Sequence, residues 1–200
     1  MNPGMRGAFT VVMLAFLALS ATLAWRQWTE AARVDAQMQL QTEQQLAVLP
    51  TQSYDNRPLD APLALIDPQL PNSRILAGYL ATLAGQPTAL LLISQTQGYA
   101  GSITLSIAIR PDGRLLASRV IAQQETPGLG GRLGDSQLAW LAQFVSRRST
   151  DNWAVKRDHG DFDQLAGATV TSRAVMTALQ EALRYFDRHR AALLGASSDE

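Results

Sequence analysis

The chain has 200 residues with 17 basic and 17 acidic side chains, so its formal net charge is zero. This length accommodates one domain with a substantial core and some additional segments. The balanced charge, without a basic stripe, argues against a nucleic-acid partner. Cysteine is absent and only two histidines occur, which excludes disulfides, thiolate zinc sites and cysteine-ligated iron–sulfur clusters within the chain. Redox chemistry would therefore need an organic cofactor.

The N-terminus contains an apolar run. Residues 7–25 carry no charge, and about 20 such residues cross the hydrocarbon core of a bilayer. Arg6 and Arg26 flank the run, and Trp25 and Trp28 occupy the position of an aromatic belt. We predict that residues 1–26 form a single transmembrane anchor.

A cleaved signal peptide is the alternative to a retained anchor. Its apolar region usually spans roughly 7–15 residues, although Ala21 to Ala24 would suit a cleavage site. The length of the run favours the anchor. The arginines on either side barely distinguish the two orientations. Because the leader before the run is so short, the whole soluble part lies on one side, and we expect that part to be exported.

Residues 27–74 are predicted to be a helical stalk followed by a linker. Residues 26–49 continue the helical pattern without a glycine, and Pro50 stops it. The prolines at positions 58, 62, 68 and 71 indicate an irregular linker or wrapping segment.

Strand patterns follow the linker. Residues 88–94 form a short apolar run typical of a buried strand. Over residues 103–110, isoleucine and leucine alternate with smaller or polar residues, which predicts a strand with one buried face. Pro111-Asp112-Gly113 predicts a turn, and residues 114–122 return as the second strand of a hairpin.

Two helices are expected after the hairpin. Asp135 could cap a helix reaching about Arg148. A second helix, from about Ser172 to His189, has an apolar stripe that indicates core packing. Residues 191–200 form a polar tail. We therefore predict an α+β fold, with a twisted, largely antiparallel sheet packed with helices and an N-terminal transmembrane helix.

The most informative segment is Asp163-Gln164-Leu165-Ala166-Gly167-Ala168-Thr169. Its Gly-Ala pair places a threonine hydroxyl directly before a helix whose N-terminus favours a phosphate. Thr171 or Ser172 could cap this helix. On spacing alone, an ordinary strand–turn–helix junction explains the segment better, because such turns are common.

Three further segments are candidates for binding. Glu125-Thr126-Pro127-Gly128-Leu129-Gly130-Gly131 forms a tight glycine-rich loop without the lysine of a P-loop. Gly98-Tyr99-Ala100-Gly101 offers an aromatic ring that could stack on a ligand or simply lie at an interface. Trp153-Ala154-Val155-Lys156 carries the only lysine in the chain.

Taken in chain order, Gly98-Tyr99-Ala100-Gly101, the glycine-rich loop from Glu125, Trp153-Ala154-Val155-Lys156 and the segment from Asp163 to Thr169, the four motifs resemble the RnfG family, the G-type subunits of the Rnf electron-transport complex. This family is related to the C-type subunits of the sodium-pumping NADH:quinone reductase. The resemblance covers the anchor and roughly residues 75–190. We expect residues 75–190 to be an FMN-binding domain. The family pattern is Asp-x-x-Ser/Thr-Gly-Ala-Thr. Here Ala166 replaces the hydroxyl residue and Ala100 stands where serine is common. The Gly-Ala-Thr core and Asp163 remain, so flavinylation is expected.

The resemblance implies that FMN is joined through its phosphate to Thr169. No catalytic residue and no metal ligand is expected. The residues expected to contact the cofactor, besides Thr169, are Asp163, Gly167, Ala168, Thr171, Glu125, Thr126, Gly128, Leu129, Tyr99 and Lys156.

The resemblance also implies partners and a location. The partners are other membrane subunits of a translocase-type oxidoreductase complex linked to ferredoxin and NAD, and a magnesium-dependent flavin transferase. The location is the bacterial inner membrane, with a single pass and the soluble domain on the periplasmic side. A membrane-tethered sensor that binds flavin without a covalent bond, or a structural subunit without flavin, are the alternatives.

Overall fold

The computed structural model describes residues 13–22, 25, 44–134 and 139–195. The chain divides into two units, residues 1–43 and 44–200. In the first unit, residues 13–22 are helical. Among the described residues, no helix is both long and apolar enough to span a bilayer. Most of the predicted anchor and stalk lies outside the described residues, as do Asp135 and the last residues of the tail.

In the described part of the second unit, four strands form one antiparallel sheet in the order β1-β2-β3-β4. They are β1 (Ser73–Leu83), β2 (Gln86–Gln97), β3 (Ser102–Ile109) and β4 (Leu115–Gln123). Ala84 and Gly85 both have positive φ angles and make a two-residue hairpin turn of the type that matches strand twist. The predicted hairpin around Gly113 (φ +84°) is confirmed. β1 was not predicted, because its burial does not alternate regularly.

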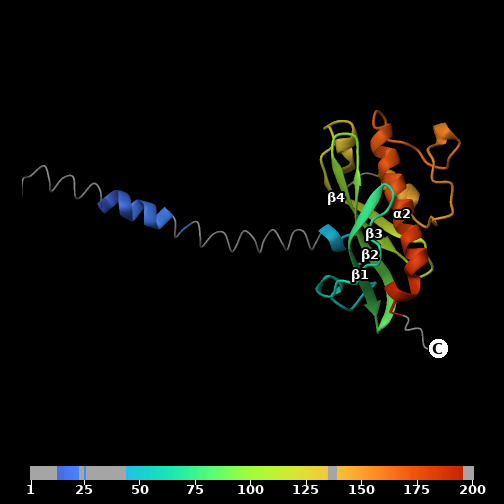
Figure 1. Cartoon of the computed structure of the whole chain (residues 1–200), viewed down its shortest axis with the longest axis horizontal. Helices are drawn as coiled ribbons and strands as arrows, with labels where there is room; N and C mark the ends of the chain where they lie inside the picture. Colours follow the sequence, from blue (N-terminus) through green and yellow to red (C-terminus); the bar gives the residue numbers. More distant parts are fainter. Residues whose placement is uncertain (1–12, 23–24, 26–43, 135–138, 196–200) are drawn as a thin grey trace, which may run out of the picture. The chain divides into compact units, whose positions relative to one another are not determined.

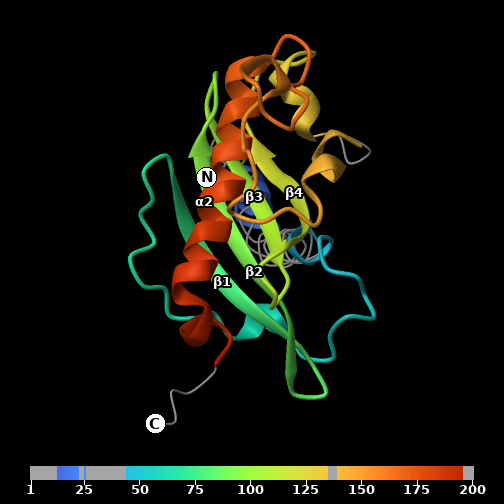
Figure 2. The ribbon, with the colours of Figure 1, turned by 90° about the vertical axis from the view of Figure 1, so that its right-hand side faces the viewer.

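Helix α2 (Thr169–Leu193) crosses one face of this sheet, as Figures 1 and 2 show. It begins three residues before the predicted start and contains one non-helical residue, His189. The predicted apolar stripe is buried against the isoleucines and leucines of β3. The stripe residues are Val175, Met176, Leu179, Leu183 and Phe186. This antiparallel sheet with its packed C-terminal helix confirms the α+β expectation for the described part of the chain.

The opposite face of the sheet is covered as well. A second apolar cluster includes Val48 and Leu49, which precede Pro50, and inward side chains of β1, β2 and β3. The Ser106 hydroxyl donates to the Gln45 carbonyl oxygen at 2.9 Å and fastens this segment to β3. The prediction that β3 has one buried face is therefore wrong, because the alternating small residues pack beneath residues 44–49.

The segment between Pro50 and β1 wraps around the sheet without forming long elements. It contains the 3-10 helix η1 (Pro58–Asp60) and an isolated bridge from Pro62 to Tyr79. The Ile66 amide donates to the hydroxyl of Tyr185 on α2 at 3.1 Å. The prolines predict an irregular segment as far as residue 74, and β1 takes the last two of these residues.

The predicted helix ending near Arg148 is wrong. The described residues there form a short 3-10 helix, η3 (Ala139–Phe144), and Ser146 has a φ angle of +66°. The reason is a competing backbone pairing. The Ser146 amide donates to the Leu115 carbonyl oxygen at 2.7 Å, and the Leu115 amide donates to the Arg147 carbonyl oxygen at 2.9 Å. The chain leaves the helix to extend the edge of β4.

Candidate functional site

Three segments meet at one end of the sheet. The pairing of Ile103 with Gln123 places the β2–β3 turn beside the loop that follows β4, and the start of α2 packs against both. Together they line a cavity of about 320 Å³. Its lining residues are Tyr99, Glu125, Thr126, Leu129, Gly130, Gly167, Ala168, Thr169, Val170 and Thr171. This volume lies at the lower end of the range for small-molecule sites.

The start of α2 supplies free hydrogen-bond donors. Ala168 is the N-cap residue, and among the residues that the structure describes no side chain caps the helix. The prediction that Thr171 or Ser172 caps it is wrong, because both hydroxyls are engaged elsewhere. The first N–H groups of a helix lack intrahelical partners and carry a partial positive charge. The cavity therefore has one wall suited to a phosphate.

Ser172 fixes the loop that precedes the helix. Its buried hydroxyl donates to the Ala168 carbonyl oxygen at 2.8 Å and accepts from the Leu165 amide at 2.9 Å. Gly167 reverses the chain with a φ angle of +75°, which glycine adopts without strain. These interactions hold residues 165–168 against the first turn of α2 and fix the backbone position of Thr169.

Two threonines of this turn face different surroundings. Thr171 is 1% exposed, and its hydroxyl donates to Oε2 of Glu125 at 2.5 Å. Thr169 is half-buried and lines the cavity. Within the described part of the chain, no hydrogen bond engages the Thr169 hydroxyl. The arrangement leaves Thr169 available for reaction, whereas Thr171 serves the packing of the site.

Glu125 lies at the junction of the three segments. It is 6% exposed, and its Oε1 accepts from the Ala100 amide at 3.0 Å while its Oε2 accepts from Thr171. A Cβ atom at Gly98 would overlap Oε1, and one at Gly130 would lie 2.5 Å from Oε2. Glycine at both positions lets the two loops close on the carboxylate.

The glycine-rich loop is a tight turn, as predicted. The Thr126 carbonyl oxygen accepts from the Leu129 amide at 3.2 Å and from the Gly131 amide at 2.9 Å. Gly128 has a φ angle of +79°. Beyond it lies the 3-10 helix η2 (Gly130–Gly134). The Leu129 side chain, 47% exposed, and Tyr99, 74% exposed, line the cavity and present apolar surface to solvent.

Asp163 and Lys156 pair with each other outside this lining. Lys156 Nζ lies 2.7 Å from Asp163 Oδ2, and both side chains are mostly exposed. The indole N–H of Trp140 donates to the Asp163 carbonyl oxygen at 2.6 Å. Trp140 in turn packs edge-on against Phe144, within a cluster that also holds Trp153 and Phe162. The aromatic cluster thus anchors the backbone of Asp163.

The expected cofactor residues therefore fall into two groups. Most of them line the cavity, whereas Gly128, Lys156 and Asp163 do not. Gly130 and Val170 also line the cavity, although neither is among the expected cofactor residues. Gly130 lies within the glycine-rich motif, five residues after the carboxylate that it approaches. No sequence signal identified Val170, which is 53% exposed within the first turn of α2.

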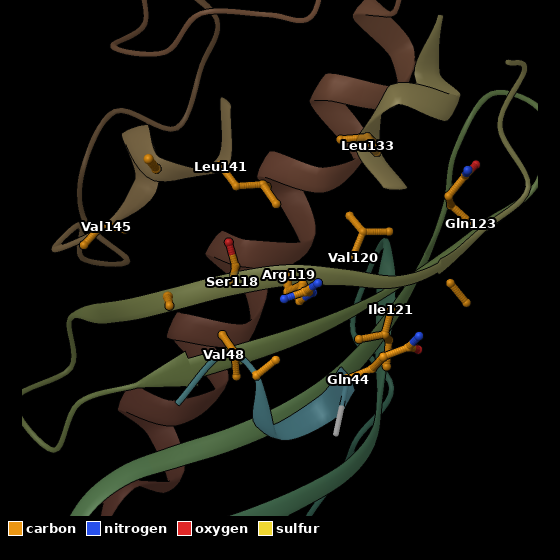
Figure 3. Close-up of a pocket in the computed structure, with 14 residues that line it drawn as sticks. Gln44, Val48, Ser118, Arg119, Val120, Ile121, Gln123, Leu133, Leu141 and Val145 are labelled. Atoms are coloured by element: carbon orange, nitrogen blue, oxygen red, sulfur yellow. The ribbon is translucent and has the colours of Figure 1, made fainter. Parts of the chain in front are cut away.

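A second cavity, of about 520 Å³, lies along β4. Figure 3 shows Val120, Ile121 and neighbouring residues of β4 between Val48 on one side and Leu133 and Leu141 on the other. None of the expected cofactor residues lines it.

The chain matches known proteins over nearly its whole length. The family model described as FMN-binding domain matches residues 98–184. The G subunit of the ion-translocating oxidoreductase complex of Pseudomonas aeruginosa is 40% identical over 196 residues, covering 95% of this chain and 92% of that protein. The protein of the same name from Stutzerimonas stutzeri is 37% identical, covering 92% and 82%.

Two solved structures are also similar. Shewanella oneidensis NqrC has a TM-score of 0.47 with 19% identity and covers 74% of each chain. The C-type member of the Na⁺-translocating NADH-quinone reductase from Parabacteroides distasonis has a TM-score of 0.46 with 21% identity, covering 56% of this chain and 61% of that one. By its identity to curated relatives over their length, the chain belongs to the RnfG family, the G subunits of ion-translocating oxidoreductase complexes.

Proposed function

We propose that this chain is the flavoprotein subunit of a membrane-bound, ion-translocating electron-transport complex and carries electrons on an FMN attached to Thr169. Its family membership supports the place in the complex, since the relatives are named as complex subunits. The FMN-binding family match supports the cofactor. The observation that carries the assignment of the residue is the Thr169 hydroxyl, which no described residue engages and which lies in the cavity beside a helix start without a side-chain cap from those residues.

The attachment is a phosphoryl transfer. The Thr169 oxygen forms a bond to the phosphorus of an FMN donor that carries a nucleotide leaving group. The bond to that nucleotide breaks, and the hydroxyl proton is lost to a base of the modifying enzyme. We propose that a flavin transferase performs this step. A bound flavin supplies reversible uptake and release of electrons, and the protein supplies placement and electrostatics.

The residues of the cavity fit the group. The donors at the start of α2 suit the phosphate, and Tyr99 and Leu129 offer apolar surface for a ring system. The cavity encloses only a small volume, which leaves part of a flavin open to partner proteins. Ala166, the departure from the family pattern, is exposed, so a hydroxyl at this position would face solvent.

The remaining roles belong to the same proposal. Residues 1–26 anchor the chain in the inner membrane, and the domain faces the periplasm, where the transferase modifies it. Other membrane subunits deliver and remove electrons. Lys156 and Asp163, outside the cavity lining, are proposed to contribute to recognition of the attachment loop rather than to contact the flavin ring.

The test measures how much flavin stays bound to the full-length protein after denaturation, in protein produced together with a flavin transferase. After acid precipitation, wild-type protein should stay yellow, and Thr169→Val should be colourless. Thr177→Val, a half-buried threonine on the same helix outside the cavity, is the matched control and should stay yellow. Retained covalent flavin in Thr169→Val would overturn the residue assignment. Colour that leaves wild-type protein with the supernatant would instead indicate a non-covalent flavin binder.

A further inference from the structure

We propose that Glu125 is a positioning residue that also lowers the reduction potential of the flavin through its negative charge. The proposal rests on the function proposed above. It concerns how this chain tunes the cofactor, and its first element is the location of the carboxylate. Glu125 lines the cavity that begins beside Thr169 and is itself 6% exposed.

The hydrogen bonds of Glu125 are ones that a carboxylate group can accept. Both oxygens act as acceptors, Oε1 from the Ala100 amide and Oε2 from the Thr171 hydroxyl. An ionised carboxylate can only accept, so this pattern uses it without a conflict. Among the described residues, no arginine, lysine or histidine forms an ion pair with Glu125. No ion pair with a described cation therefore offsets the charge of this carboxylate.

The same bonds make Glu125 a structural link. One carboxylate joins the β2–β3 turn through Ala100, the loop after β4 through its own backbone, and α2 through Thr171. Because Gly98 and Gly130 have no side chains, the backbones of the two loops lie close to this carboxylate. Because the carboxylate is held from both sides, its charge stays at a fixed position in the wall of the cavity.

A fixed negative charge disfavours the addition of electrons nearby. In a partly buried site the effective dielectric constant is about 20 rather than 80, so such a charge acts more strongly than it would in water. Removing it should favour the reduced cofactor. We expect the equilibrium constant for reduction to rise about tenfold, which corresponds to about 30 mV for a two-electron couple.

Glu125→Gln isolates the charge from the geometry. Glutamine keeps an oxygen for the Ala100 amide, and the Thr171 hydroxyl can reverse and accept from the new amide. Thr171→Val has the opposite effect: it removes one hydrogen bond and keeps the charge. Glu181→Gln is the matched control, because Glu181 is also a buried carboxylate, 7% exposed, but lies on the far part of α2 and bonds to Asn72 and Ser73.

The experiment measures the flavin potential by spectroelectrochemistry in full-length, detergent-solubilised protein produced with a flavin transferase. We expect the potential to rise in Glu125→Gln, and to stay within a twofold change of the wild-type equilibrium constant in Glu181→Gln. The flavin potential of Thr171→Val should be closer to the potential of wild-type protein than to that of Glu125→Gln. An unchanged potential in Glu125→Gln would overturn the proposal, as would an equal rise in Thr171→Val, which would indicate geometry rather than charge.

Two outcomes separate this proposal from the one it rests on. If wild-type protein carries no flavin under these conditions, the proposed function fails. If wild-type protein is flavinylated but folded Glu125→Gln is not, only the inference about Glu125 fails, because the carboxylate would then be required for attachment instead of for tuning the potential.

Discussion

Replacing Ser172 with alanine tests whether the attachment loop is held in place by the helix that follows it. The substitution removes the hydrogen bond to the Ala168 carbonyl oxygen and leaves the buried Leu165 amide without its acceptor. A lost hydrogen bond costs about 1 kcal/mol, and an unsatisfied buried donor costs about 1–3 kcal/mol. The better helix propensity of alanine returns about 0.5 kcal/mol.

The net expectation is a loss of about 2 kcal/mol in the free energy of unfolding. For a domain of about 150 residues this lowers Tm by about 4–8 °C. Thermal unfolding of the full-length protein, followed by near-ultraviolet circular dichroism, measures the change. The fraction of chains that carry FMN should fall as well, because Thr169 would lose its fixed approach to the modifying enzyme.

Ser94→Ala provides the matched control. Ser94 is fully buried on β2, and its hydroxyl has no hydrogen-bond partner in the described part of the protein. Removing an unsatisfied hydroxyl should be neutral or slightly stabilising, within about 0.5 kcal/mol. If Ser172→Ala were as stable as Ser94→Ala and fully flavinylated, Ser172 would not hold the loop.

Two further changes probe the site and the packing around α2. Asp163→Asn should lower the fraction of flavinylated chains, because the attachment motif loses its carboxylate. It should change the free energy of unfolding by less than about 1 kcal/mol, because the ion pair with Lys156 is exposed. Intact mass measures this fraction, with the exposed turn variant Asp112→Asn as the control; full modification of Asp163→Asn would contradict the role. Burial raises the pKa of Tyr185 above its ordinary value of 10.0, so the contribution to stability is complete below pH 10 and is lost as pH rises through the higher folded-state pKa. Tyr185→Phe should therefore lose less stability than wild type between pH 9 and 12 in thermal melts, and identical losses would show that the pKa of this hydroxyl is the same in the folded and unfolded protein.

The sequence predicted the elements with regular patterns. β3 alternates and α2 carries a continuous apolar stripe, and both are present. β1 was not predicted, because its apolar residues contribute to the clusters on both faces of the sheet and its burial has no clean period of two. The expected helix to Arg148 failed for a tertiary reason, since the pairing of Ser146 and Arg147 with Leu115 depends on residues about 30 positions apart.

The sequence motifs predicted which segments form the candidate site, but they did not predict the hydrogen bonds within it. The order of the motifs predicted that the glycine-rich loop and the Thr169 loop belong together, and the structure places both around one cavity. The motifs did not predict that Thr171 is buried on Glu125 or that Ser172 holds the loop. Such hydroxyl bonds depend on three-dimensional packing, because serine and threonine occur as readily in caps and exposed turns.

The most direct test of the account is the mass of one peptide. Trypsin cleaves after Arg157 and Arg173 and releases residues 158–173, which contain the three hydroxyl residues Thr169, Thr171 and Ser172. In protein from cells that contain a flavin transferase, fragmentation of this peptide should place one FMN phosphoester on Thr169. An unmodified peptide, or FMN on Thr171 or Ser172, would contradict the account.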